Sequence, residues 1–364
     1  MTDWINQSIA SLNPYQPGKP IDELARELGI TDIIKLASNE NPRGPGPMVR
    51  ECVARAAEEL SRYPDGSGYL LKAALAEHLD VEVNRLTLGN GSNDVLELAA
   101  KVTLEAGLEG VMSEHGFVVY YLAITGCSAK LVRVPAKNYG HDLEGYLDAI
   151  TDATRIVFIA NPNNPTGTWV TEADLVDFLE RLPERIWVVL DEAYYEYVEA
   201  QGYPNGVRLV DRYPNLIVTR TFSKIHGLAS LRIGYSVSSP LAADLMNRAR
   251  QPFNVNSLAL AAAQGALADR QFVATSRTLN REGMGVITAG LAKLGLEYIP
   301  SVGNFVCFDV GQASTPVYER LLSEGVIVRP VAEYGLPTHL RVSVGLPEEN
   351  QRFLRTLERV LAQA

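Results

Sequence analysis

The chain has 364 residues, of which 46% are hydrophobic and 21% are charged, and this balance excludes a disordered chain. The length is enough for two or three domains with a sizeable core. Acidic residues (43) outnumber Lys and Arg (33), which leaves a net charge of −10 at pH 7. A surface of this sign repels nucleic acids and anionic membranes, so neither is expected as a partner, although a few local arginines can still bind a small anion.

The three cysteines, Cys52, Cys127 and Cys307, are widely spaced and form no CxxC pair. This spacing favours free, buried or half-buried thiols over a disulfide framework or a zinc site, and no metal is expected. The N-terminus lacks the basic and apolar segments of a secretory signal, and no apolar run approaches the roughly 18 residues of a membrane span. These features predict a soluble, cytoplasmic protein.

Short β-branched runs alternate with helical patterns over the first two thirds of the chain. Apolar strands separated by helices are typical of βαβ units, so the predicted fold class is α/β, with a mostly parallel central sheet and helices on both faces. Strands are expected at 86–89, 110–112, 130–134, 155–160, 186–190 and 215–220, and helices at 92–105 and 172–182.

After about residue 240 the pattern changes to that of a smaller α+β domain. An Ala- and Leu-rich helical region is expected first, followed by a segment at 297–309, a helix near 315–324 and strands at 326–329 and 339–344. The first 30 residues, which contain PYQPGKP, are too short to fold alone. We therefore expect an N-terminal arm (1–30) packed on the small domain, a large domain (31–245) and a small C-terminal domain (246–364), with the helical region at 241–293 crossing the last boundary.

Two strand ends carry side chains suited to cofactor chemistry. The segment LIVTRTFSK (216–224) ends at Lys224, and an amine partly desolvated there can lose its proton and attack a carbonyl. The segment WVVLDEAY (187–194) places Asp191 at a strand's carboxyl end, where it could pair with a protonated pyridine nitrogen, with Tyr194 three residues on. A solvated lysine and a helix-capping aspartate are the ordinary alternatives.

Two loops add hydrogen-bond donors. In ANPNNPTG (160–167) two prolines force an irregular loop around Asn163 and Asn164, and Asn164 is the better donor to a ring oxygen. In LGNGSNDVLEL (88–98) a glycine turn opens a helix, and converging N–H groups there can hold a phosphate. This turn lacks the Lys of a P-loop and the full GxGxxG fingerprint, which argues against a Rossmann-type nucleotide enzyme. A simple turn and a capped helix remain alternatives.

The order of these motifs resembles that of the fold-type I pyridoxal-phosphate enzymes, the aspartate aminotransferase superfamily. The likeness extends from PYQPGKP (14–20) and KLASNENP (35–42) through RYPDGSGYLLKAALA (62–76) to HLRVSVG (339–345). The most specific stretches are ANPNNPTG and TFSKIHGLASLRIGY. Within the superfamily, the chain is most similar to the family of histidinol-phosphate aminotransferases, which are class II enzymes of this fold.

This resemblance implies pyridoxal 5'-phosphate as cofactor and assigns roles by position. Lys224 is implied as the Schiff-base lysine that also moves the proton, and Asp191 as the partner of the pyridinium nitrogen. Tyr63 is implied to reach the cofactor phosphate of a neighbouring subunit, which implies a homodimer with shared active sites. The other implied ligands are Asn164 and Tyr194 at the ring oxygen; Ser92, Asn93, Ser223 and Arg232 at the phosphate; Phe117 on the ring face; and Arg341, Arg329, Tyr15, Asn39 and, near the same site, Asn41 for the substrate.

The implied reaction is a ping-pong transamination of histidine biosynthesis. L-Histidinol phosphate would become imidazole acetol phosphate, and 2-oxoglutarate would become L-glutamate. Arginine forks suit both the phosphate and the carboxylate. Alternatives on the same fold are an aromatic amino-acid aminotransferase and a threonine-phosphate decarboxylase, and an alternative of another class is a non-catalytic ligand-sensing domain. His226, Ser230, Tyr121 and His115–Gly116 depart from the family's usual residues, and we expect His226 to have a packing or surface role.

Overall fold

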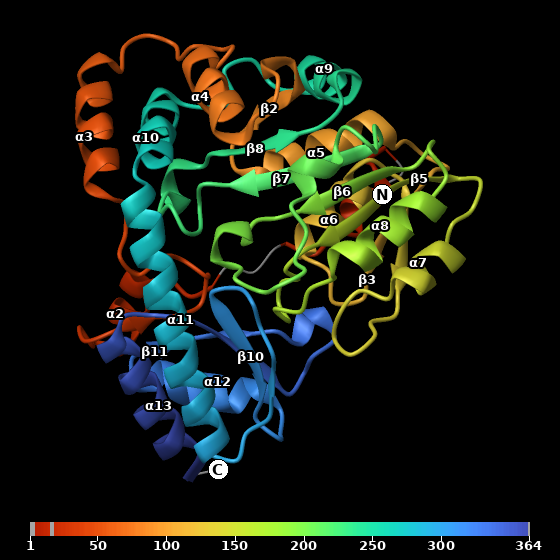
Figure 1. Ribbon diagram of the computed structural model, residues 1–364. Coiled ribbons are helices and arrows are strands. Elements are labelled where there is room, and N and C mark those ends of the chain that lie inside the picture. The colour runs from red at the N-terminus through yellow and green to blue at the C-terminus, as the bar shows by residue number, and fades with distance from the viewer. Residues whose placement is uncertain (1–3, 15–17, 363–364) are drawn as a thin grey trace.

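The computed structural model describes residues 4–14 and 18–362 and contains one large and one small sheet (Figure 1). The large sheet has seven strands in the order β2-β8-β7-β6-β5-β3-β4. All neighbours run parallel except β8, which is antiparallel to both β2 and β7. Its strands are β2 (Leu86–Gly89), β3 (Glu109–Ser113), β4 (Lys130–Val134), β5 (Thr154–Ala160), β6 (Trp187–Asp191), β7 (Leu216–Thr221) and β8 (Gly234–Val237).

The mostly parallel α/β fold is therefore confirmed, and the six expected strands begin and end within one residue of the observed ones. The strand that the sequence analysis does not include is β8, GYSV. It has four residues, one of them a glycine, and its place in the sheet comes from pairing with β2 and β7 on either side.

Helices cover both faces of the large sheet because the buried strands alternate their side chains between two cores. In β5, Val157 and Ile159 pack on one face, while Ile156 and Phe158 pack on the other. The first core includes residues of α3 (Pro47–Ala56), α4 (Tyr69–Leu79), α7 (Leu143–Asp148), α8 (Glu172–Arg181) and α10 (Ser257–Ala268), and the second includes α5 (Ser92–Thr103), α6 (Val118–Gly126) and α9 (Pro240–Ala249).

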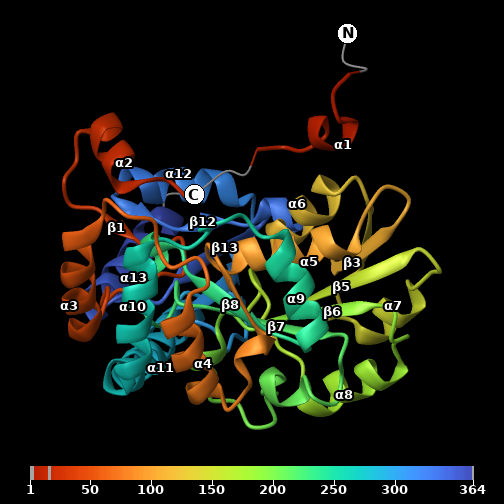
Figure 2. The same cartoon turned by 90° about the horizontal axis from the view of Figure 1, so that it is seen from above.

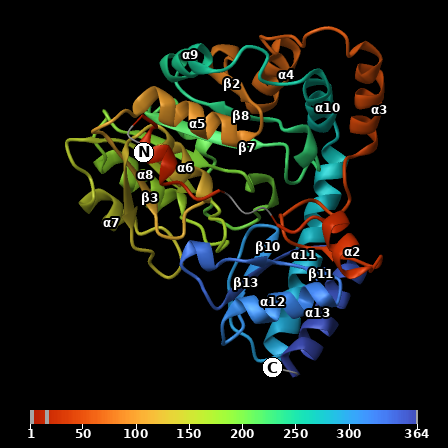
Figure 3. The same cartoon turned by 180° about the vertical axis from the view of Figure 1, so that it is seen from behind.

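The small sheet has the order β12-β13-β10-β9 and is antiparallel. A separate core lies between it and three helices, in the lower part of Figure 3. A short parallel pair, β1 (Ile34–Lys35) and β11 (Val326–Ile327), lies at its side. The elements are α11 (Arg270–Lys293), β9 (Tyr298–Ile299), β10 (Phe305–Asp309), α12 (Ser314–Ser323), β12 (Arg329–Pro330), β13 (His339–Ser343) and α13 (Pro347–Ala362).

The helical region expected at 241–293 consists of three helices, α9, α10 and α11. A segment with a turn at Pro252 and Phe253 separates the first two, and Asp269 caps α11 by accepting a hydrogen bond from the N–H of Phe272. Helix α10 packs against α3 and α4, beside the large sheet, whereas α11 runs down to the small sheet (Figure 1). The proposed domain boundaries stay predictions.

The N-terminal segment contacts both parts of the molecule. Helix α1 (Gln7–Ala10) lies against α6, while α2 (Ile21–Leu28) buries Leu24 against Ile327 (Figure 2). In the ranges 4–14 and 18–362, none of the helices has both the length and the apolar character that crossing a membrane requires.

Candidate active site

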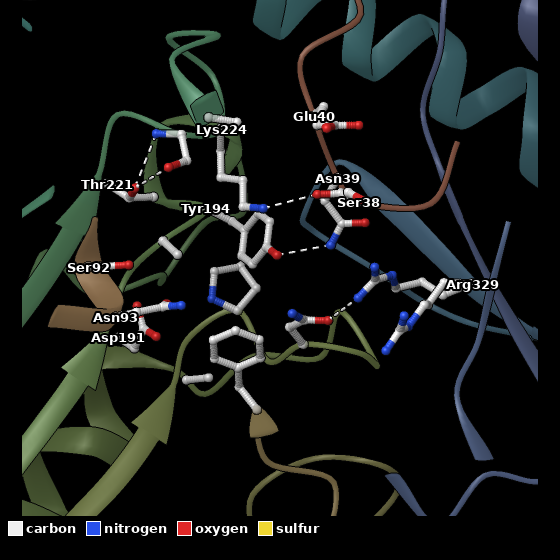
Figure 4. A pocket seen from close by; sticks show the side chains of 18 of the residues that line it. Ser38, Asn39, Glu40, Ser92, Asn93, Asp191, Tyr194, Thr221, Lys224 and Arg329 are labelled. Carbon is white, nitrogen blue, oxygen red and sulfur yellow. Dashed lines mark hydrogen bonds between the residues drawn. The ribbon is translucent and has the colours of Figure 1, made fainter. Parts of the chain in front are cut away.

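A cavity of about 240 Å³ opens at the carboxyl ends of β5, β6 and β7 and extends to the small sheet. This edge is where open α/β sheets bind their ligands. Figure 4 shows the side chains that converge on it from both sheets and from the segment after β1. Of the residues predicted from the sequence, the cavity is lined by Asn39, Ser92, Asn93, Phe117, Asn164, Asp191, Tyr194, Ser223, Lys224, Arg232, Arg329 and Arg341.

Lys224 follows β7 and projects into this cavity. Its Nζ donates to the backbone carbonyl of Ser38 (3.1 Å) and lies 5.5 Å from the centre of the Tyr194 ring. Burial and the positive charges of Arg341 and Arg232 lower the pKa of the Lys224 amine to about 8, against the opposing effect of nearby carboxylates. A substantial fraction of this amine is therefore neutral, and nucleophilic, near pH 8.

Asp191 is the last residue of β6, and its buried side chain lines the cavity. Its two carboxylate oxygens accept hydrogen bonds from Tyr120 Oη (2.8 Å) and from Thr219 Oγ1 (3.1 Å). Burial raises the pKa of the Asp191 carboxyl, although these two bonds and the charge of Lys224 favour the carboxylate. A cationic ring nitrogen placed against it would stabilise the ionised form.

Hydrogen bonds hold the cavity's hydroxyl and amide groups in two separate sets. Asn39 Nδ2 donates to Tyr194 Oη (2.9 Å), and the backbone N–H of Asn39 donates to Ser343 Oγ (2.8 Å) on β13. Asn164 Oδ1 accepts from the guanidinium of Arg341 (2.5 Å). Asn164 therefore directs its amide oxygen toward Arg341 and keeps Nδ2 as a donor.

A cradle for an anion lies at the start of α5. Gly91 precedes the helix and provides no side-chain cap, so the first N–H groups, at Ser92 and Asn93, are not satisfied by a capping side chain. A Cβ on Gly91 would lie 2.4 Å from the Arg232 guanidinium, and one on Gly234 would lie 2.4 Å from the backbone nitrogen of Ser92. A phosphate is well bound where a guanidinium, the N-terminus of a helix and backbone N–H groups lie close together.

Two arginines lie at the opposite side of the cavity. Arg329 and Arg341 face each other as register partners on β12 and β13, and both are buried (7% and 6% exposed). Arg341 donates to Asn164 Oδ1 and to the carbonyl of Ala37 (2.6 Å), while its buried Nε has no partner among residues 4–14 and 18–362. Two like charges held this close favour a bound anion.

Some predicted residues lie elsewhere. Asn41 binds the carbonyl of Ile225 (2.6 Å) and Ser276 Oγ, and Asn163 binds Thr166 Oγ1, so both hold loops behind the cavity. Tyr63 is 83% exposed and lies outside the cavity of its own chain, and Tyr15 lies outside the described residues.

Three further residues of the site were missed by the sequence analysis. Tyr120 and Thr219 hold Asp191, and Thr221 accepts from the N–H of Ser223 (3.1 Å). The period of β7 could have indicated the threonines, since residues 219 and 221 share a face. His226 is buried and packs on Phe222 with 5.0 Å between ring centres, in agreement with a packing role.

Comparison with known proteins explains this combination of groups. Residues 31–357 match the model of the family "Aminotransferase class I and II". The chain belongs to this aminotransferase family. Within the family it is 57% identical to "Histidinol-phosphate aminotransferase 2" of Pseudomonas fluorescens (strain Pf0-1), over 98% of this chain and 96% of that protein.

Other histidinol-phosphate aminotransferases are also similar over nearly their full length. The chain is 55% identical to "Histidinol-phosphate aminotransferase 1" of Nitrosococcus oceani, over 98% of this chain and 96% of that protein. Among solved structures, a histidinol-phosphate aminotransferase of Sinorhizobium meliloti in complex with pyridoxal-5'-phosphate aligns with a TM-score of 0.92 and 32% identity, covering 99% of this chain and 98% of that one.

Proposed function

We propose that this aminotransferase uses pyridoxal 5'-phosphate to convert L-histidinol phosphate and 2-oxoglutarate into imidazole acetol phosphate and L-glutamate, a step of histidine biosynthesis. The names of the similar proteins support this substrate. The observation that carries the proposal is the cavity itself, which combines a desolvated lysine, a buried carboxylate and an anion cradle at one side with two buried arginines at the other.

The residues present fit the cofactor. The α5 terminus, Ser223 and Arg232 would hold its phosphate, because a Cβ at Gly91 or Gly234 would occupy the space in which these groups converge. Asp191 would pair with the ring nitrogen. Asn164 and Tyr194 would bind the ring oxygen, and Phe117 would lie against the ring face. When bound, pyridoxal phosphate withdraws electrons from the substrate carbon that loses its proton.

Lys224 has two tasks in this proposal. Its neutral amine would attack a carbonyl with loss of water, and later the same Nζ would take a proton from the substrate carbon and pass it to the cofactor's aldehyde carbon. Both tasks require an amine that is neutral for part of the time, which fits a lysine whose pKa is lowered to about 8 by burial and by Arg341 and Arg232.

Arg341 and Arg329 would bind the anionic end of each substrate. Histidinol phosphate presents a phosphate, and glutamate presents a carboxylate, so one pocket must accept both in turn. The guanidinium fork suits either anion. The buried Nε of Arg341, which has no hydrogen-bond partner in the part of the chain that the structure describes, supports this role, since a substrate oxygen would satisfy it.

The proposed assembly is a cytoplasmic homodimer in which Tyr63 completes the partner's site. Tyr63 is 83% exposed and stacks on Phe253, itself 46% exposed, with 4.8 Å between ring centres. Such an aromatic pair at the surface is suited to burial against a second copy. Sedimentation of the wild type and of Tyr63→Ala, with cofactor affinity measured in parallel, tests this assembly: the variant should bind cofactor more weakly.

Substrate profiling tests the proposed reaction. The values of kcat/KM are compared for L-histidinol phosphate, L-phenylalanine and threonine phosphate, with 2-oxoglutarate as the acceptor where an amine is transferred. The proposal predicts the highest value for histidinol phosphate. A higher value for phenylalanine would favour an aromatic aminotransferase, release of carbon dioxide from threonine phosphate would favour a decarboxylase, and absence of turnover with all three would favour a ligand-sensing role.

A further inference from the structure

The two arginines of the anion pocket have different partners. In the described part of the chain, Arg341 donates to the neutral oxygens of Asn164 and Ala37. Arg329 instead forms an ion pair with Glu333, four residues later, at 2.5 Å between Nη2 and Oε1. The positive charge of Arg329 is therefore partly neutralised by the carboxylate of Glu333.

Glu333 places a negative charge next to the pocket, but its side chain does not line the pocket. It lies on the short 3₁₀ turn Ala332–Tyr334 and its side chain is 36% exposed, whereas that of Arg329 is 9% exposed. Tyr334 and Arg329 line the cavity, but Glu333 does not. The buried guanidinium thus borders the ligand space, while the carboxylate that it binds does not.

We propose that Glu333 is a specificity-determining residue that lowers the positive charge of the anion pocket and so balances its affinity for phosphate against its affinity for carboxylate. The inference rests on the proposed function, because only a ping-pong enzyme with one phosphorylated and one carboxylate substrate needs this balance. In such an enzyme the phosphorylated product must leave before the acceptor's carboxylate can enter. A pocket with two uncompensated arginines would favour the dianion at the expense of the monoanion.

The magnitude of the effect should follow the charge of the ligand. Coulomb energy is proportional to the product of the charges, so the carboxylate of Glu333 repels a phosphate dianion about twice as strongly as a carboxylate monoanion at the same site. Removing this charge therefore changes the logarithm of affinity for phosphate by about twice as much. A residue that only orients Arg329 would change both affinities by one common factor.

Glu333→Gln separates charge from orientation, because its amide oxygen can still accept from Arg329. The probes are inorganic phosphate and acetate, used at pH 8 as inhibitors of the half-reaction in which L-glutamate transfers its amino group to the cofactor of the holoenzyme, followed by the cofactor absorbance. We expect the inhibition constant to fall about fivefold for phosphate and about twofold for acetate, the upper range for a partly exposed ion pair. The KM for histidinol phosphate should fall more than that for glutamate.

Glu324→Gln is the matched control, because Glu324 also pairs with an arginine, Arg359 (2.8 Å), but on the surface away from the cavity. It should leave both inhibition constants unchanged. The inference is overturned if Glu333→Gln leaves the phosphate constant unchanged, raises it, or shifts both constants by the same factor. Because the donor is glutamate, these outcomes are separate from failure of the proposed function, which is absence of wild-type turnover with histidinol phosphate.

Discussion

The two sides of the cavity are built on different principles. On the large-sheet side, Asp191 ends β6, Thr219 lies near the end of β7 and Lys224 follows β7, and Asp191 and Thr219 are register partners. On the small-sheet side, Arg329 and Arg341 lie on short antiparallel strands, and Arg341 is held by Asn164 and Ala37, which lie on other segments of the chain. The first side is fixed by one sheet, whereas the second depends on how the small sheet packs against the large one.

This difference predicts that substitutions on the two sides impair different functions of the site. Changes at the strand ends should affect cofactor binding and chemistry. Changes at the arginines should affect the substrate and leave the cofactor in place.

The largest expected effect is that of Lys224→Ala. The variant loses both the nucleophile and the base, so turnover should fall by at least about 10⁴-fold, together with the visible absorbance of lysine-bound cofactor. Lys101→Ala is the control, since Lys101 is a surface residue of α5 that binds a backbone carbonyl. Retained turnover in Lys224→Ala would contradict the proposed role.

Arg341→Ala should lower kcat/KM for histidinol phosphate and for glutamate by about 100-fold, because each loses a charge-assisted hydrogen bond. The absorbance of the bound cofactor should remain. Arg341→Lys, which keeps the charge but loses the fork, should show an intermediate loss. Loss of cofactor with unchanged substrate affinity would show that Arg341 binds the cofactor and not the substrate.

Capture of the cofactor by the apoprotein should depend on pH through Lys224. The folded-state pKa of this lysine, about 8, lies below its ordinary value of 10.5, so the amine becomes neutral as the pH rises through about 8. The capture rate should rise through that pH and then level off, and at pH 7 it should be about tenfold below the plateau. Stopped-flow absorbance from pH 6 to 10 measures this, and a midpoint near 10.5 would contradict it.

Arg341→Ala should move that midpoint upward, because the Arg341 charge is one cause of the lowered pKa. A midpoint that stays unchanged would show that the Arg341 charge does not contribute to the lowered pKa of Lys224.

The smallest expected effect is that of Tyr120→Phe. This variant keeps the buried ring but removes the hydrogen bond to Asp191, which should weaken cofactor binding about tenfold, as for one bond to a charged group. Thr219→Val removes the other side-chain bond and tests the same carboxylate. Equal cofactor affinity in both variants and the wild type would show that neither donor holds Asp191 in its working form.

The strand-end motifs could be predicted from sequence because each is local. A buried run followed by Asp191 or by Ser223–Lys224 specifies both the strand and the edge at which the side chain emerges. Tyr120 could not be found in this way, since it lies within the apolar helix α6 and meets Asp191 only through packing.

Features that depend on distant segments also escaped prediction. The Arg329–Arg341 pairing follows from the register of two short strands that lie apart in the chain and meet only when the small sheet forms. Asn41 follows Asn39 by two residues, yet its side chain turns toward Ile225 and Ser276 instead of the cavity. Loop conformation, which periodicity does not describe, decides this difference.

The central claim is that one lysine and one arginine pocket serve a phosphorylated and a carboxylate donor in turn. Its most direct test is a single-turnover experiment in which the holoenzyme is mixed with L-histidinol phosphate alone or with L-glutamate alone, and the cofactor absorbance is followed. We predict that each donor by itself removes the visible band, and that Arg341→Ala slows both reactions. Conversion by glutamate but not by histidinol phosphate would contradict the claim.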